Sequence, residues 1–186
     1  MWLLVIVVIF LGLAVSIILY NNLVNKKNRI LNSFAGIDVL LKKRYDLIPN
    51  LVSSVKQYMK HEQGVLAQIT ELRTRALGGD LSDAETIEVD RQITGALKGL
   101  MIAVENYPEL KASENFLQLQ ASLNEVEEQI SAARRAYNAT VLEYNNAVEM
   151  IPTNLMAGLM RYKKKNFFEI AEAEKPSVNV QTMFGN

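Results

Sequence analysis

Apolar residues recur every three or four positions along the chain from Asn115 to Pro152. This is the period of a helix that buries one narrow face against other helices. At about 1.5 Å per residue, such a helix measures roughly 55 Å. We therefore predict a long rod along which the rest of the soluble chain packs. Its apolar positions are Phe116, Leu119, Leu123, Val126, Ile130, Ala133, Tyr137, Val141, Tyr144, Val148 and Ile151.

The same period predicts three helices upstream of the rod. Gly78-Gly79 suits the end of the second helix, because glycine readily takes the left-handed conformation after a last turn. Ser82 and Glu85 have the spacing of a capping box at the start of the third helix. The predicted helices cover residues 23–45, 49–77 and 83–105.

The junction of the first two predicted helices, at Pro49, can be interpreted in two ways. Proline lacks an N–H and disfavours helical conformation at the preceding Ile48. The chain either turns here, with Asp46 capping a new helix, or continues as one kinked helix, since the apolar phase extends through Val52 and Val55. We favour the turn, because it gives segments similar in length to the third helix.

The first twenty residues carry no charged side chain. As a helix they span about 30 Å, the thickness of a hydrocarbon core. Trp2 and Tyr20 stand at the two ends, where amphipathic rings prefer the membrane interface. A cleavable signal peptide is the alternative, but no Lys or Arg precedes the run and the run is longer than an h-region. We therefore predict a membrane anchor over residues 1–20.

Charge asymmetry predicts the orientation of this anchor. The positive-inside rule keeps the side that carries the basic residues in the cytoplasm. We expect a single-pass protein of the cell membrane with its N-terminus outside and the remainder cytoplasmic; a periplasmic or extracellular bundle is the alternative. The basic residues that follow the anchor are Lys26, Lys27, Arg29, Lys42, Lys43 and Arg44.

Composition argues against several functional classes. Lys and Arg number 20, as do Asp and Glu, so no overall basic field points to nucleic acid. The absence of cysteine excludes disulfides and thiolate metal sites. The single histidine, His61, and the lack of Glu-x-x-His exclude a di-iron carboxylate bundle. We expect no metal, no cofactor and no enzymatic activity; a hydrolase without a recognisable motif is the alternative.

Polar residues gather near Pro49 as a candidate interaction site. The alternative is an intrahelical ion-pair network, for example between Asp38 and Lys42, which are four residues apart. We favour this alternative. The candidate residues are Asp38, Arg44, Asp46 and Asn50.

A second candidate site lies in the rod, where Tyr137 and Tyr144, like Asn138 and Asn145, are seven residues apart. Each pair therefore lies on one helix face. A buried Asn at a heptad position fixes helix register, and a buried Tyr needs a partner for its hydroxyl. We favour a role in specifying the core over contact with a ligand or partner.

A basic run near the C-terminal end is flanked by Met and Phe. It suits contact with anionic lipid, together with the cations that follow the anchor. The alternative, which we favour, is a solvated helix end. The candidate lipid contacts are Lys26, Lys27, Arg29, Arg161, Lys163, Lys164 and Lys165.

Several short motifs are spread over nearly the whole chain. The longest is Ile37-Asp38-Val39-x-Leu41-Lys42-x-Arg44-x-Asp46-Leu47-Ile48-Pro49-Asn50-Leu51-Val52. The others are Tyr20-Asn21-x-Leu23-Val24, Tyr107-Pro108-Glu109-Leu110, Asn115-Phe116-x-x-Leu119-Gln120, Ala133-Arg134, Tyr137-Asn138-x-x-Val141 and Tyr144-Asn145. Together these motifs resemble the LemA family.

This resemblance implies an all-α fold, with an N-terminal transmembrane helix followed by an antiparallel four-helix bundle of long helices. The expected segments are the anchor over 1–20, the bundle over 21–152, and a basic amphipathic segment and tail over 153–186. The family supplies neither an established activity nor an accepted catalytic residue. Its members are often encoded beside TPM-domain proteins or HtpX-like membrane proteases, which associates them with envelope stress or quality control.

We therefore predict a membrane-anchored helical scaffold or adaptor. Its expected partners are the membrane and either a second copy of the chain or a membrane protein of the TPM-domain or HtpX-like type. A lipid-binding membrane-surface protein is the alternative function.

Overall fold

The computed structural model describes residues 1–59, 61–79 and 81–168, and every regular element in these ranges is a helix. The predicted all-α fold is confirmed. The helices are α1 (Trp2–Lys56), α2 (Gln63–Leu77), α3 (Asp83–Val104), α4 (Pro108–Lys111), α5 (Glu114–Glu149) and α6 (Thr153–Leu159).

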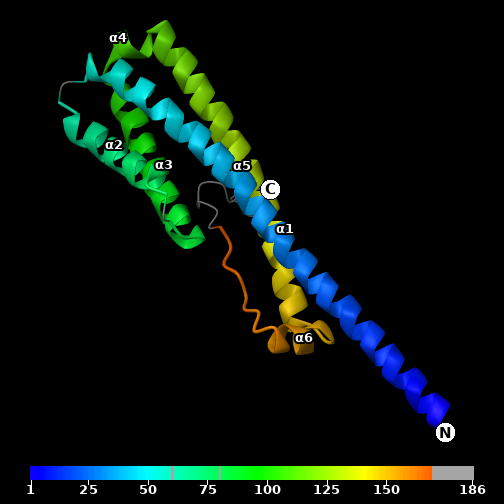
Figure 1. Ribbon diagram of the computed structural model, residues 1–186. Coiled ribbons are helices and arrows are strands. Elements are labelled where there is room, and N and C mark those ends of the chain that lie inside the picture. The colour runs from blue at the N-terminus through cyan, green and yellow to red at the C-terminus, as the bar shows by residue number, and fades with distance from the viewer. Residues whose placement is uncertain (60, 80, 169–186) are drawn as a thin grey trace, which may run out of the picture.

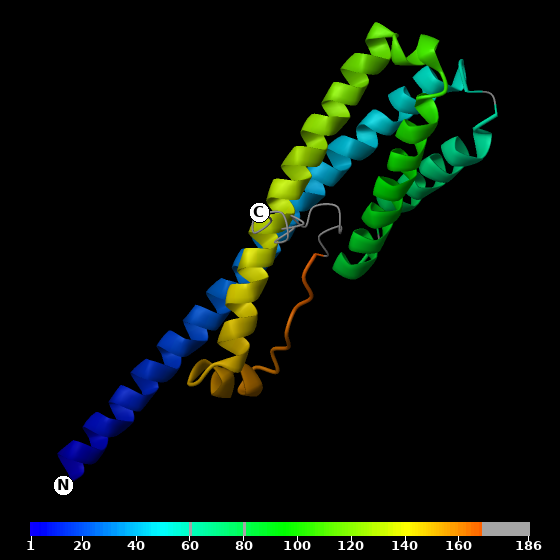
Figure 2. The ribbon, with the colours of Figure 1, turned by 180° about the vertical axis from the view of Figure 1, so that it is seen from behind.

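The four longest helices run alternately in opposite directions. Helix α1 leads away from the N-terminus, and α5 returns alongside it (Figure 1). Helices α2 and α3 form an antiparallel pair that covers the half of α1 far from the N-terminus, as both views show (Figure 2). The short α4 joins α3 to α5 at that far end.

The predicted anchor and the first bundle helix form one uninterrupted helix of 55 residues. Residues 2–20 project beyond the bundle (Figure 1), and nearly all of their large apolar side chains are exposed. This is the described helix that is long and apolar enough to cross a membrane. From Leu23 onward the helix buries one face, which includes Ile30, Phe34 and Ile37.

The predicted turn at Pro49 is wrong. Helix α1 continues through Pro49 to Lys56, and its apolar phase is kept because Leu51 and Val55 remain buried. Asp46 therefore lies within the helix, on its exposed side, and caps nothing. The chain leaves the helix only after Lys56, so α2 is shorter than predicted.

A hydrogen bond from α2 satisfies the carbonyl that Pro49 leaves without its helical partner. In a helix the N–H of residue 49 would bond to the carbonyl of Tyr45, and Pro49 has no such N–H. The Nε of Arg73 donates to that carbonyl oxygen instead, at 2.8 Å. The half-buried backbone acceptor is thus satisfied by a side chain from the neighbouring helix.

Two other predicted features are confirmed. The Ser82 hydroxyl accepts from the amide of Glu85, whose carboxylate accepts from the amide of Ser82, which completes the capping box of α3. Helix α5 buries most of the predicted stripe, but Ile151 lies beyond its end and is 82% exposed. The buried stripe residues are Phe116, Leu123, Val126, Ile130, Tyr137, Val141 and Tyr144.

The chain reverses after α6. The Ile151–Pro152 peptide bond is cis, and α6 follows it. At the end of α6, Arg161 takes a positive φ of 55°, and the amide of Tyr162 donates to the carbonyl of Ala157 at 2.9 Å. The following residues return along α5 as an extended strand of chain, drawn in orange in Figure 1. The remainder of the predicted tail, residues 169–186, lies outside the described residues.

Candidate functional site on helix α5

Asn138 and Asn145 each bind both backbone groups of one residue on the returning chain. Asn145 donates from Nδ2 to the Lys165 carbonyl and accepts at Oδ1 from the Lys165 amide, both at 2.9 Å. Asn138 does the same with Phe168, at 2.9 and 2.8 Å. We call these two residues the asparagine ladder and residues 163–168 the docked segment. Each ladder amide pairs with the segment as a neighbouring β-strand would.

The spacing of the ladder matches the spacing of an extended chain. Seven residues along a helix rise about 10.5 Å. The three residues from Lys165 to Phe168 span about 10 Å when extended. Because Asn145 binds Lys165 and Asn138 binds Phe168, the segment runs antiparallel to α5. The heptad spacing noted in the sequence therefore serves to hold a strand of chain.

The two tyrosines of the same motif also contact the docked segment. Tyr144 donates its hydroxyl to the Lys163 carbonyl at 3.1 Å, and Tyr137 donates to the Asn166 carbonyl at 3.5 Å. Burial raises the pKa of both tyrosines above the usual 10. Both phenols thus keep the proton with which they donate. The motif packs in the core, as favoured from the sequence, and it also binds another segment of the same chain.

Phe168 gives the docked segment an apolar end. Its side chain is 3% exposed, and its ring centroid lies 5.4 Å from that of Tyr137 and 6.1 Å from that of Phe34. The Arg134 guanidinium lies 5.8 Å from the centre of the same ring. Within the described part of the chain, the ladder binds the docked segment through main-chain atoms, so side-chain selectivity there comes from the Phe168 position.

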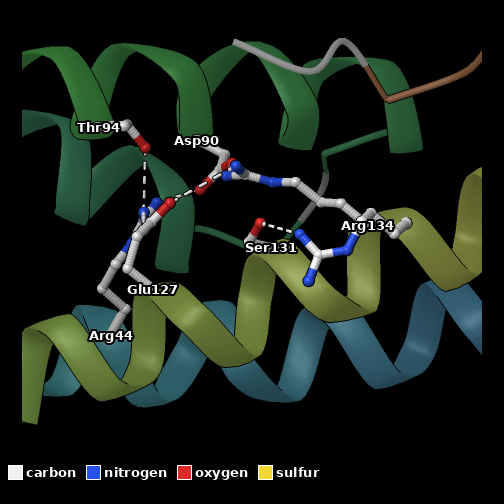
Figure 3. A network of polar contacts seen from close by, with 7 residues as sticks. Arg44, Asp90, Thr94, Glu127, Ser131 and Arg134 are labelled. Carbon is white, nitrogen blue, oxygen red and sulfur yellow. Dashed lines mark hydrogen bonds and ion pairs between the residues drawn. The ribbon is translucent and has the colours of Figure 1, made fainter. Parts of the chain in front are cut away.

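A cluster of four charged residues, three of them buried and Glu127 partly exposed, lies beside this pocket and joins three helices (Figure 3). Arg44 of α1 pairs with Asp90 of α3 and binds Glu127 of α5 at 2.7 Å. Arg134 of α5 pairs with the second oxygen of Asp90 and lies 3.6 Å from Glu127. The Thr94 hydroxyl also accepts from Arg44, at 3.0 Å. We call Arg44, Asp90, Glu127 and Arg134 the ion cluster.

The three buried charges pair with one another and with Glu127, and the Nε atoms of Arg44 and Arg134 are buried without a hydrogen-bond partner among the described residues. Arg44 and Asp90 are each 1% exposed and Arg134 is 7% exposed. Charges this deep are tolerated when they are paired and hydrogen-bonded. Burial, with the Asp90 carboxylate next in effect, raises the pKa of the adjacent Tyr45 to about 12. The ion cluster therefore cross-links α3 to the α1–α5 pair.

A cavity of about 700 Å³ lies between α3, α5 and the docked segment. Asp90 and Arg134 of the ion cluster line it, together with Tyr137 of α5 and Phe168 of the docked segment. The docked segment therefore forms one wall of the cavity, and the ion cluster contributes to another. Movement of the segment would change the size of this cavity.

The structure does not bring the four residues of the first candidate site together. Asp38, Asp46 and Asn50 are exposed on α1, whereas Arg44 points inward into the ion cluster. Asp38 makes no ion pair with Lys42 within the described ranges. Partial burial and the charge of Asp83 raise the pKa of Asp38. Arg44 is thus part of the architecture, and its three companions are not assembled with the ladder.

Sequence reasoning missed Asp90, Glu127 and Arg134 as one network. Three charges of the cluster occupy positions at which the helical period calls for an apolar side chain. Arg44 falls between Leu41 and Ile48, Asp90 between Ile87 and Ile93, and Arg134 between Ile130 and Tyr137. Charged residues at positions of the apolar stripe on three helices could have indicated a buried cluster.

The candidate lipid contacts fall into two groups. Lys26 and Arg29 pair with Glu143, at 3.7 and 2.9 Å, and Lys164 pairs with Glu149. The remaining cations form the second group. Lys27 lies 5.2 Å from the centre of the Tyr162 ring, Lys165 lines the cavity, and Arg161 and Lys163 are exposed.

Within the described ranges, no group of three or more His, Cys, Asp or Glu residues is placed to hold a metal ion. His61 is exposed in the connection between α1 and α2. The groups that α5 contributes are hydrogen-bonding and packing groups, and they hold a segment of the same chain.

Known proteins of similar sequence align with most of this chain. A family model described as the LemA family matches residues 33–184. The chain is similar to Protein LemA of Metamycoplasma hominis, with 26% identity over 88% of this chain and 74% of that protein. It is also similar to Magnetosome protein MamQ 2 of Paramagnetospirillum magneticum, with 24% identity over 89% of this chain and 68% of that protein. Magnetosome protein MamQ of Magnetospirillum gryphiswaldense is 22% identical over 77% of this chain and 60% of its own length.

Proposed function

This chain belongs to the LemA family, and we propose that it acts as a membrane-anchored helical scaffold or adaptor without covalent chemistry. The observation that carries the proposal is the asparagine ladder, which holds an extended polypeptide by its main chain. A site of this kind suits recognition of another polypeptide, as a sheet edge does when it accepts an added strand.

The anchor and the bundle contribute different parts of this function. Residues 2–20 of α1 concentrate the protein at a bilayer, and the same helix continues into the bundle without a break. The bundle is thereby held close to the membrane surface. The side-chain amides of the ladder, which make four hydrogen bonds to a bound segment, are therefore also held at a limited distance from the membrane surface.

The docked segment is the first occupant of the ladder, and a partner segment is the second. Main-chain hydrogen bonds accept any extended segment, while the pocket around Phe168 favours an aromatic residue at one position. The partner that we propose is the same segment of a second copy or an extended segment of a membrane protein. Family association points to TPM-domain proteins and HtpX-like proteases, and to envelope stress or quality control as the setting.

Site-specific photocross-linking in native membranes tests this proposal. Leu142 lies on α5 between Asn138 and Asn145 and is 52% exposed. Leu117 is a matched control, because it lies on the same helix at its far end and is 48% exposed. A photoreactive residue at position 142 is expected to capture a second copy or a membrane protein, and one at 117 is not.

The proposal fails if cross-linking and affinity capture from native membranes both recover the protein alone and monomeric. Equal capture at positions 117 and 142 would also count against the ladder as the docking site. Mass spectrometry of the captured peptide then separates a second copy from a different membrane protein.

We further propose that the bundle lies in the cytoplasm. The support is the group of cations after the anchor, which includes Lys26, Lys27 and Arg29. Protease treatment of intact cells, with any outer barrier opened, is expected to leave the bundle undigested. Digestion of the bundle under these conditions would contradict the orientation.

A further inference from the structure

Exposed apolar side chains are concentrated in one short part of the bundle. Outside residues 1–20, six described large apolar side chains are more than 60% exposed. Two of them, Val39 and Ile102, stand apart on α1 and α3. The other four fall between residues 150 and 159, on α6 and the residues just before it. They are Met150 (62%), Ile151 (82%), Leu155 (74%) and Leu159 (81%).

This part of the chain lies next to the membrane end of α1. Ala157 of α6 and Ala147 of α5 pack against Leu23, which is buried. Leu23 is three residues beyond Tyr20, the end of the uncharged run, and therefore about 4.5 Å further along the helix axis. Both ribbon views place α6 at the end of the bundle nearest the projecting anchor (Figures 1 and 2). A helix at that level lies at the depth of lipid headgroups.

Polar groups border the apolar residues as an interfacial segment requires. Tyr162 follows α6, and the Lys27 ammonium lies 5.2 Å from the centre of its ring. Arg161 and Lys163 are exposed on either side of Tyr162. Aromatic rings and cations of this kind prefer the headgroup region, and apolar side chains beside them enter the acyl boundary.

We propose that α6 and the two residues Met150 and Ile151 form a second membrane contact, which we call the membrane foot. Its occupant is the lipid of the leaflet from which α1 emerges, because the foot is continuous with the segment that crosses the bilayer. Apolar side chains this exposed mark an interaction site in a soluble domain. With two contacts, the bundle is fixed in tilt and rotation about α1, and the ladder keeps one orientation toward the membrane.

Depth-dependent fluorescence quenching in vesicles tests the foot directly. The chain contains no cysteine, so single cysteines at Leu155, Leu159 or Ile102 take an environment-sensitive dye at one position each. Ile102 is the matched control, because it is 72% exposed and lies near the end of α3 far from the anchor. The full chain is reconstituted in phosphatidylcholine–phosphatidylglycerol vesicles that contain nitroxide-labelled lipid.

Dyes at positions 155 and 159 are expected to emit at shorter wavelength and to be quenched by the nitroxide lipid, whereas the dye at 102 is not. Quenching at 155 and 159 that does not exceed quenching at 102 would overturn the proposal, and would show that a protein or solvent covers this surface.

A charged variant provides a second arm. Leu155→Asp with Leu159→Asp replaces two exposed side chains, so circular dichroism is expected to show an unchanged fold. The double variant is expected to abolish quenching of a dye at Ile151 while α1 remains inserted in the vesicles. Persistence of that quenching would contradict the foot. This result is independent of the capture at Leu142, which tests the ladder.

Discussion

Arg73 donates a hydrogen bond from its Nε to the carbonyl oxygen of Tyr45 at 2.8 Å. That oxygen is the one whose helical partner is missing, because residue 49 is proline. A side chain from α2 therefore takes the place of a backbone donor inside α1. The bond satisfies this carbonyl where α1 passes through Pro49, and the same helix supplies both the predicted anchor and a wall of the bundle.

Loss of the Arg73 side chain is expected to destabilise the bundle only when Pro49 is present. Arg73→Met leaves the half-buried Tyr45 carbonyl unsatisfied and should lower the free energy of unfolding by about 1–3 kcal/mol. In a Pro49→Ala background the backbone N–H returns, so the same change should cost clearly less. Chemical denaturation of the four proteins in detergent measures this coupling.

Arg75→Met is the control for this cycle, since Arg75 is exposed on the same helix. An equal cost of Arg73→Met in both backgrounds would show that Arg73 acts through packing and not through the Tyr45 carbonyl.

Removal of the central carboxylate of the ion cluster is expected to be severe. Asp90→Ala leaves the guanidinium groups of Arg44 and Arg134 buried with one fewer partner each. Breaking a buried pair in this way typically costs about 3–5 kcal/mol. The measurement is the free energy of unfolding, at low and at high salt, because a buried cluster is screened little.

Glu88→Ala is the matched control, because Glu88 pairs with Arg91 on the same helix at the surface. Exposed pairs of this kind contribute little, so we expect a nearly unchanged stability. If Asp90→Ala is tolerated as well as Glu88→Ala, the ion cluster does not hold α3 in place.

The capping box of α3 predicts a pH-dependent contribution to stability. Hydrogen bonds from the amide and then the hydroxyl of Ser82 lower the pKa of Glu85 below its usual 4.5. The contribution is therefore complete above pH 4.5 and is lost as the pH falls through the lower pKa of the folded state. Unfolding of Glu85→Gln should depend less steeply on pH in this range than unfolding of the parent chain.

Ser82→Ala removes the other half of the box and is expected to cost about 1 kcal/mol at neutral pH. Parallel pH profiles for the parent and Glu85→Gln proteins would contradict the assigned role of Glu85.

Local patterns predicted the parts of the fold that depend on local interactions. The stripe from Phe116 to Tyr144 and the pair Ser82 and Glu85 are examples, because helical period and capping act within a few residues. The helix through Pro49 was the less favoured of two interpretations, since the donor that replaces the missing N–H belongs to Arg73, which is 24 residues away. No property of the sequence around Pro49 reveals that donor.

Part of the candidate site on α5 could be predicted from the sequence, and part could not. The spacing of Asn138 and Asn145 was visible, and so was the need of the tyrosines for a partner. The docked segment was not visible, because the ladder binds the main chain of Lys165 and Phe168, and main-chain bonds impose little on side-chain identity. The ion cluster was detectable in principle from charges at stripe positions.

Asn138 and Asn145 of α5 hold an extended segment of the chain by its backbone. Residue-resolved amide hydrogen exchange of the full chain measures this directly at Lys165 and Phe168. Both amides should be protected in the parent protein, and Asn138→Ala with Asn145→Ala should speed their exchange by about tenfold or more, because each loses its acceptor. Asn146→Ala, an exposed neighbour on the same helix, should leave both amides protected. Exchange at Lys165 and Phe168 that is unchanged in the double variant would contradict the claim.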